Sequence, residues 1–365
     1  MIGCEDIYKV VDAVVPLYVA LILGYASVKW WRIFTAEQCN AVNRFVCYFT
    51  FPLFTFEFTA HVNPFEMNYR FVAADVIAKL IIVTVLAFWA RYTTKGSYGW
   101  SITSFSLSTL TNALVVGVPF VKAMYGQAAV DLVVQASVVQ AILWLTALLF
   151  VLEIRQTRND FYSNDDAGGR VIPAAESDGG NDLEGNTKVV NNTKNITKNN
   201  NSTLRLMKAV SLKLVMNPNL YGCVIGIAWA FISNKWHFEM PSMVEGSILI
   251  LSKAGTGTAM FSMGLFMALQ EKLISCGASL TILGMVLKFI AGPAAMAIGC
   301  IAMGLHGDVL RVAIIQAAVP QSITSFIFAK EYGLHPDVLS TAVIFGMLVS
   351  LPILVGYYAF LGYLH

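Results

Sequence analysis

Charge is scarce in this chain. Of its 365 residues only 13% are Asp, Glu, Lys or Arg, whereas 57% are hydrophobic. Soluble domains carry about 25% charged and about 45–50% apolar residues. The deficit excludes an ordinary soluble domain. Because nearly all the charges lie between long apolar runs, the composition predicts a polytopic membrane protein with the lipid bilayer as its surroundings.

Several chemical signatures are missing as well. The net charge of +2 and the lack of a basic stripe argue against a nucleic-acid partner. The six cysteines are scattered singly, without a C-x-x-C pair, and the five histidines fall near expected helix ends without an acidic helical partner. We therefore expect no metal site, no cofactor and no nucleophile–base set. A Gly-rich phosphate loop is also absent, so we predict that the protein is not an enzyme.

What the chain does have is long apolar runs, since a membrane-spanning helix needs about 20 mainly apolar residues. The runs predict ten transmembrane helices, at 7–27, 38–60, 70–91, 100–124, 128–153, 217–234, 242–269, 275–304, 308–330 and 336–363. They divide into a first five-helix repeat (1–155) and a second (206–365). Between them, residues 156–205 are rich in Asn, Asp, Gly, Thr and Lys, a composition that predicts a disordered loop.

The two halves resemble each other in layout. Pro16-Leu17-Tyr18 opens the first predicted helix, and Pro218-Asn219-Leu220-Tyr221 opens the sixth. Because each repeat has an odd number of helices, the second must be inverted relative to the first. The fold class is therefore an all-α polytopic membrane protein built from two inverted five-helix repeats, an architecture typical of secondary transporters.

Each half also contains a broken helix. Helix 4 is interrupted between Leu110 and Pro119, and helix 9 between Ala317 and Ser325, in a stretch that includes Pro320. Paired interruptions at corresponding positions point to a transporter's substrate site. If the breaks meet, the N-termini of two half-helices place partial positive charge at one point, which suits a carboxylate. Asn112 beside the first break, and Gln321 and Ser322 at the second, are candidates to hydrogen-bond the substrate.

Charged and polar residues within other predicted helices are further candidates. Asp75 and Lys79 lie four residues apart on helix 3 and so share a face. They could form a proton or cation relay, or a fixed pair that orders the helices. Gln140 of helix 5 could line the cavity or hydrogen-bond a neighbouring helix. Lys288 of helix 8, which matches Lys79 in depth, is expected to extend to the membrane interface.

Orientation follows from Lys and Arg in the short connections. The side that includes Lys29, Arg32, Arg91 and Arg155 carries more of them than the side that includes Lys9, Arg70 and Lys235. The bias predicts that the central loop is cytoplasmic and that both termini lie on the opposite side.

At several long stretches the chain resembles the plant PIN-FORMED auxin carriers, within the wider auxin efflux carrier family. The stretches are Val15 to Tyr18, Phe34 to Cys39, Asn63 to Phe65, Met260 to Ala268 and Phe328 to Asp337, continuing from Leu339 to Met347. The short central loop is similar to that of the members that reside in the endoplasmic reticulum. The resemblance implies this membrane as the location, with lumenal termini; the plasma membrane is the alternative.

The resemblance also implies a mechanism and a site. Helices 1, 2, 6 and 7 would form a scaffold domain and helices 3–5 and 8–10 a transport domain, in a homodimer that moves anionic indole-3-acetate and related aromatic carboxylates by an elevator-like, gradient-driven motion. The crossed helices 4 and 9 would bind the anion. The family's site residues fall on Asn112, Pro119, Gln140 and Thr55, with its helix-3 pair on Asp75 and Lys79 as a support or ion site. Pro320, Gln321, Ser322 and Thr324 at the second break complete the predicted substrate site.

The sequence departs from the family's pattern at Ser325, where many members have proline, at Leu145, where some have an aromatic residue, and at Lys253, where others have aspartate. Two alternative functions stay open: a proton- or cation-coupled exchanger of the same fold that uses Asp75, and a membrane sensor that binds auxin without transporting it. Saturable binding without flux would indicate the sensor.

Overall fold

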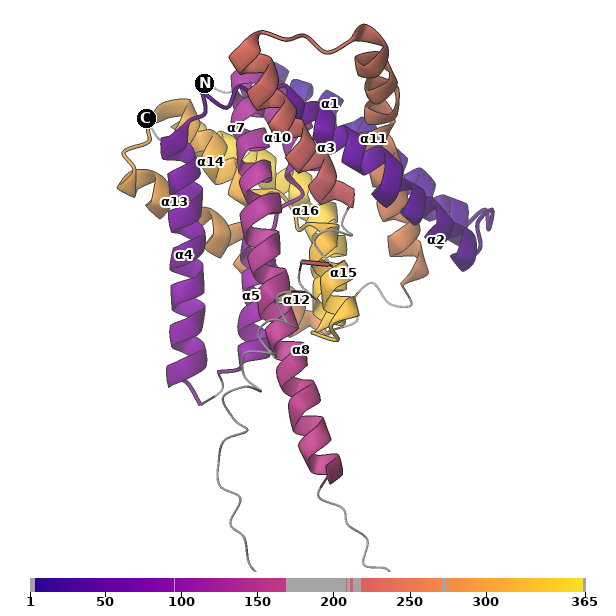
Figure 1. Cartoon of the computed structure of the whole chain (residues 1–365), viewed down its shortest axis with the longest axis vertical. Helices are drawn as coiled ribbons and strands as arrows, with labels where there is room; N and C mark the ends of the chain where they lie inside the picture. The colour runs from indigo at the N-terminus through magenta and orange to yellow at the C-terminus, as the bar shows by residue number, and fades with distance from the viewer. Residues whose placement is uncertain are drawn as a thin grey trace, which may run out of the picture. The chain divides into compact units, whose positions relative to one another are not determined.

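A computed structural model describes residues 4–94, 96–168, 208, 211–212, 218–270, 274 and 276–363 (Figure 1). These residues form helices and one isolated backbone bridge, and they contain no extended strand. The prediction of an all-α protein is therefore confirmed for the part of the chain that the structure describes.

Helices occupy most of both halves, and four of them contain a short π-helical segment, labelled η. The first half comprises α1 (Cys4–Lys29), α2 (Ala36–Phe45), η1 (Val46–Thr50), α3 (Phe51–Ala60), α4 (Tyr69–Tyr92), α5 (Tyr98–Thr109), η2 (Ala113–Gly117), α6 (Val118–Tyr125), α7 (Gln127–Val139), η3 (Gln140–Trp144) and α8 (Leu145–Gly168). The second comprises α10 (Pro218–Trp236), α11 (Ser242–Leu269), α12 (Ala278–Val286), η4 (Leu287–Ala291), α13 (Gly292–Ala302), α14 (Gly307–Ala318), α15 (Ile323–Glu331) and α16 (Pro336–Tyr363).

Six of the described helices are long and apolar enough to cross a membrane. They span Val11–Lys29, Tyr69–Tyr92, Gln127–Gln156, Ser242–Leu269, Ala278–Ala302 and Pro336–Tyr363. The other four predicted ranges are helical as well, but two of them are interrupted. The structure thus agrees with a polytopic membrane protein.

The predicted loop begins later than expected. Helix α8 continues to Gly168, so residues 156–168 are helical and not part of a structureless loop. Leu, Glu, Arg and Gln at 152–156 are good helix formers, and loss of hydrophobicity alone does not end a helix. The rest of the predicted loop, residues 169–205, lies outside the described residues. Residues 146–216 form a unit separate from the compact unit made by the remainder.

Within the larger unit, one set of helices packs through close backbone contacts. Helix α1 lies against α11, and α3 lies against both α10 and α11. Gly24 and Gly264 face each other's helix so closely that a Cβ at either would overlap a backbone carbonyl of the other helix. Small residues at such a contact let helices approach in a membrane, where apolar burial does not drive association.

A second set of contacts surrounds the broken helices. Helix α4 packs against α13, α13 against α14, α14 against α7, and both α12 and α15 against α16. Phe71, Ala74, Met296 and Cys300 are buried where α4 meets α13. This packing holds the two interruptions in the interior of the protein.

Both predicted interruptions are present. Helix α5 ends at Thr109, and Leu110 takes an extended conformation (φ −81°, ψ 117°) before η2 begins. Helix α14 ends at Ala318, and the chain is extended at Val319 (φ −58°, ψ 139°) before α15 begins. Pro320 lies inside the second break. Pro119 lies where η2 passes into α6, six residues after the start of this half-helix at Ala113, and not at the first break itself.

Candidate functional site

The two breaks meet and pair through their backbones. The N–H of Asn112 donates to the carbonyl of Pro320 (2.8 Å), and the N–H of Ser322 donates to the carbonyl of Leu110 (3.3 Å). Between these bonds, Thr111 and Gln321 form an antiparallel bridge. Each break therefore supplies hydrogen-bond partners for the other, as backbone away from water requires.

Two half-helices begin at this crossing. Segment η2, which leads into α6, starts at Ala113, and α15 starts at Ile323. The first N–H groups of a helix lack partners within it, and the helix dipole makes this end partly positive. The Ser322 hydroxyl accepts from the N–H of Thr324 at 3.3 Å. The Asn112 side chain does not cap η2. The crossing is thus suited to an anion.

Five of the predicted site residues come together around one small cavity of about 50 Å³ beside the crossing. They are Thr55 of α3, Asn112, Gln140, Ser322 and Thr324. These residues come from both halves of the chain and supply hydroxyl and amide groups that can hydrogen-bond a carboxylate.

The small cavity adjoins a vestibule of about 1230 Å³, because Asn112, Ser322 and Thr324 line both. The vestibule reaches the ends of several helices, since Ala36 and Gln270 also line it. Its walls near the crossing are apolar and include Val115, Leu145, Met260, Met263 and Ile323. An apolar cavity with a few convergent polar groups is the usual form of a small-molecule site.

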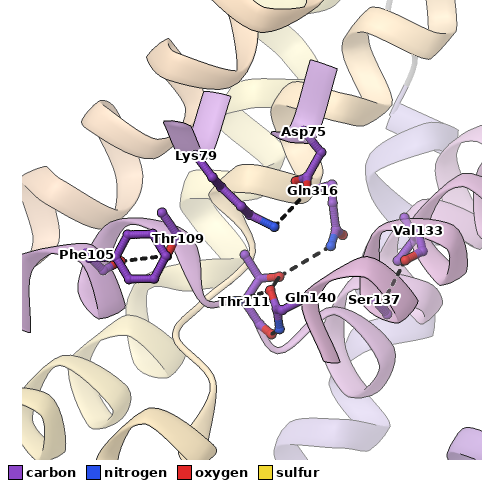
Figure 2. A network of polar contacts seen from close by, with 9 residues as sticks. All are labelled: Asp75, Lys79, Phe105, Thr109, Thr111, Val133, Ser137, Gln140 and Gln316. Carbon is purple, nitrogen blue, oxygen red and sulfur yellow. Dashed lines mark hydrogen bonds and ion pairs between the residues drawn. The ribbon is translucent and has the colours of Figure 1, made fainter. Parts of the chain in front are cut away.

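Gln140 combines the two roles considered for it. Its Oε1 accepts from the backbone N–H (3.0 Å) and the hydroxyl (3.1 Å) of Thr111, and its Nε2 donates to the Thr111 carbonyl (2.9 Å). Figure 2 shows this contact, together with the bond from Gln316 Nε2 to the Thr111 hydroxyl (3.3 Å). Gln140 thus ties α7 and η3 to the first break while it also lines the cavity.

Asp75 and Lys79 form a buried ion pair on α4, with Lys79 Nζ 2.8 Å from Asp75 Oδ2. The ammonium lies 5.6 Å from the centre of the Trp144 ring, within the range of a cation–π contact. The pair lines a cavity of about 30 Å³ together with Thr111, Gln140 and Gln316. The pair is not among the residues around the small cavity at the crossing.

Three predicted site residues line none of these cavities: Pro119, Pro320 and Gln321. Pro320 acts through its carbonyl, which accepts from Asn112. The Gln321 side chain is 1% exposed and donates to the Ser106 carbonyl and to Ser325 Oγ, both at 2.7 Å. Its contribution is to join α5 to α15.

Two polar residues near the crossing were not anticipated as such. Thr111 and Gln316 are uncharged and belong to no recognisable motif, and their hydrogen-bond partners are distant in sequence.

The expectation that Lys288 extends to the membrane interface is wrong. Its side chain is 1% exposed, and its amine donates to the Leu110 carbonyl at 3.2 Å.

Comparison with known proteins agrees with this architecture. A family model described as "Membrane transport protein" matches residues 9–358. The chain belongs to this family. It is 70% identical to auxin efflux carrier component 5 of Arabidopsis thaliana over the full length of both chains. It is 62% identical to probable auxin efflux carrier component 5a of Oryza sativa subsp. japonica, with 98% of each chain covered.

A more distant relative is auxin efflux carrier component 8 of Arabidopsis thaliana, 39% identical over 98% of this chain and 99% of the relative. These matches confirm the resemblance to the auxin efflux carriers that the motifs indicated. They also place the chain among transporters and not among enzymes.

Two of the departures from the family's pattern lie at the site. Ser325 Oγ donates to the Ser322 carbonyl at 2.6 Å and accepts from Gln321 Nε2, so it closes the first turn of α15 without a proline. Leu145 lines both the vestibule and the small cavity. Lys253 is exposed on α11 and lines none of the three cavities.

Proposed function

We propose that this protein is an auxin transporter that moves anionic indole-3-acetate across a membrane. The observation that supports it best is the crossing. Two half-helix N-termini and the Asn112 side chain converge where the vestibule wall is apolar. The names of the relatives, all of them auxin efflux carriers, support the same substrate.

The proposed binding mode follows from the lining residues. The carboxylate lies at the crossing, where Asn112 Nδ2, the Ser322 hydroxyl and the Thr324 hydroxyl can donate to it. Thr55 and Gln140 lie on the other walls of the small cavity. The indole ring extends into the vestibule, because the small cavity alone is too confined for an aromatic ring and the part of the vestibule wall near the crossing is apolar.

For the architecture, we propose ten transmembrane helices in two inverted repeats. The six helices that satisfy length and hydropathy supply six spans, and α2–α3, α5–α6, α10 and α14–α15 supply the others. The contacts of α1, α3, α10 and α11 with one another support a scaffold domain. We further propose that the broken helices move against this scaffold as an elevator, within a homodimer.

The proposed location is the endoplasmic reticulum membrane, and the alternative is the plasma membrane. The positive-inside bias supports a cytoplasmic central segment and termini on the opposite, lumenal side. The vestibule is lined by Ala36 at the start of α2, Gln270 after α11 and Lys330 near the end of α15. These connections lie on the side with more Lys and Arg. With the proposed orientation the vestibule opens to the cytoplasm, and the proposed role is intracellular auxin homeostasis.

Uptake into liposomes tests the proposal. Purified protein is reconstituted, a membrane potential is imposed, and entry of labelled indole-3-acetate is measured for the wild type and Asn112→Ala. The matched control is Asn40→Ala, because Asn40 also lines the vestibule but does not line the small cavity at the crossing. We expect saturable, potential-dependent uptake in the wild type and the control, and its loss in Asn112→Ala.

Two results would contradict the proposal. Binding of indole-3-acetate without flux, from folded protein, indicates the sensor. Flux that requires a proton or sodium gradient indicates the coupled exchanger.

A further inference from the structure

Lys288 is an unusual residue in this fold. It lies on the π-helical segment η4, close to the middle of the α12–α13 helix, and 1% of its surface is exposed. An ionisable side chain held away from both membrane surfaces is costly and, in membrane proteins, is usually functional.

The charge of Lys288 lacks the compensation that Lys79 has. Lys79 is paired with Asp75, whereas among the described residues Lys288 has no carboxylate partner. Its one hydrogen bond, at 3.2 Å, goes to the neutral Leu110 carbonyl at the C-terminal end of α5. A cation at a helix C-terminus is favourable, but this contact neutralises less than an ion pair would.

The Leu110 carbonyl links Lys288 to the candidate site. The same oxygen accepts from the Ser322 N–H at 3.3 Å, and Ser322 begins α15 and lines the small cavity. Lys288 is therefore two hydrogen bonds away from the N-terminus of the half-helix at which the anion is proposed to bind. The packing is close here, because a Cβ on Gly292, one turn after Lys288, would overlap the Ser108 carbonyl.

We propose that Lys288 is a positioning and specificity residue for the anionic substrate, an inference that rests on the proposed function. Its ammonium fixes the Leu110 carbonyl and so holds Ser322 and the start of α15 in place. Burial without a carboxylate partner disfavours the charged form of this amine, whereas the Asp75–Lys79 pair is already neutral as a whole. The carboxylate of a bound substrate favours the ammonium form of Lys288. The substrate carboxylate completes the charge balance, although it does not touch the lysine.

A role in specificity and a role in stability predict opposite effects of removing the amine. A buried lysine without an acidic partner destabilises the fold, and replacing such groups with apolar side chains of similar size is often neutral or stabilising. Lys288→Met retains the length of the side chain and removes its charge. We expect this variant to unfold at the same temperature as the wild type or higher, while it binds the anion less well.

The test compares an anionic ligand with a neutral one of nearly the same shape. Affinities for indole-3-acetate and for indole-3-acetamide are measured in detergent for the wild type, Lys288→Met and Lys288→Arg. Lys122→Met is the control, because Lys122 is an exposed lysine of α6 that lines none of the cavities described above. In Lys288→Met we expect indole-3-acetate to bind at least about 10-fold more weakly than in the wild type. The affinity for indole-3-acetamide should stay within about 2-fold of the wild-type value. Lys288→Arg, which keeps the charge, should recover most of the affinity for acetate.

Three outcomes overturn the inference. One is unchanged affinity for acetate in Lys288→Met. Another is an equal loss for both ligands together with a lower unfolding temperature, which indicates a structural role. The third applies if the wild type does not bind indole-3-acetamide. In that case, a Lys288→Arg variant that binds indole-3-acetate no better than Lys288→Met also indicates a structural role. A wild type that binds no indole-3-acetate contradicts the proposed function instead, so the two failures can be told apart.

Discussion

The side-chain amide of Gln140 pairs with the backbone of Thr111 as a neighbouring strand would, accepting from its N–H and donating to its carbonyl. Gln140 therefore supplies hydrogen-bond partners for both the N–H and the carbonyl of Thr111, which lies between two helical segments and has no partner within either. A break in a membrane helix is possible only where such partners exist. The Gln140 side chain therefore helps to stabilise the break between α5 and η2.

The first prediction concerns this pair. Gln140→Leu leaves the N–H and carbonyl of Thr111 without side-chain partners, and each unsatisfied buried group costs about 1–3 kcal/mol. We expect uptake of indole-3-acetate to fall at least about 10-fold and the unfolding temperature to drop. Gln127→Leu, at the exposed start of α7, is the control. Full activity in Gln140→Leu would show that the break is held by other contacts.

The second prediction distinguishes a fixed ion pair from a relay. Asp75→Asn leaves the Lys79 ammonium buried without its partner, and breaking a buried pair in this way costs about 3–5 kcal/mol. The double variant Asp75→Leu/Lys79→Met removes both charges. We expect it to be more stable than Asp75→Asn and to retain more uptake. If wild-type flux follows a pH or sodium gradient and the double variant loses this dependence, the pair is a relay.

The third prediction concerns the contact between α1 and α11. An added Cβ at Gly264 overlaps the backbone of α1, whereas one at Gly257 meets no other atom within 4 Å. Gly264→Ala should destabilise the protein by about 1–3 kcal/mol, as overpacking does. Gly257→Ala should be neutral or stabilising, because Ala favours helix over Gly by about 1 kcal/mol. Thermal unfolding in detergent measures both, and equal unfolding temperatures would contradict the close contact.

The fourth prediction uses a departure from the family's pattern. Leu145 lines the vestibule next to the crossing, where an aromatic ring could pack against the indole. An aromatic pair adds about 0.5–1.5 kcal/mol, so Leu145→Phe should strengthen binding of indole-3-acetate by about 2–10-fold. Leu143→Phe is the control, since Leu143 is 48% exposed on the same turn. Equal or weaker binding in Leu145→Phe would place the ring elsewhere in the vestibule.

Local sequence was sufficient to predict the helices and their interruptions. Apolar runs locate the helices, because hydrocarbon admits only helices whose backbone groups are satisfied, and six of the described helices are long and apolar enough to span a membrane. The second break is explicit in Pro320, which cannot donate to a helix. The first is less explicit, because Pro119 marks the first turn of α6 and the chain opens earlier, at Leu110. Asn112 and Ser322 could be assigned from the breaks and Gln140 and Thr55 by resemblance, and all four line the small cavity.

Contacts between distant residues were not predictable in this way. The role of Thr111 depends on hydrogen bonds to Gln140 and Gln316, which lie on other helical segments and are distant in sequence. Lys288 was misassigned because a lysine on an apolar helix usually extends to the interface, and only the fold shows the Leu110 carbonyl within its reach. The extension of α8 to Gly168 was not predicted, because a fall in hydropathy marks the end of the apolar part of a helix and not the end of the helix itself.

The backbone pairing at the crossing also constrains biosynthesis. The Asn112 N–H receives its partner from Pro320, more than two hundred residues further along the chain. At about 5–20 residues per second, a ribosome needs roughly 10–40 s to make that stretch. During this interval the Asn112 N–H lacks this partner, so we expect the first half to depend on water, lipid headgroups or an insertion chaperone until the second half is made. Halves made as separate chains should therefore be degraded alone and rescue each other when produced together.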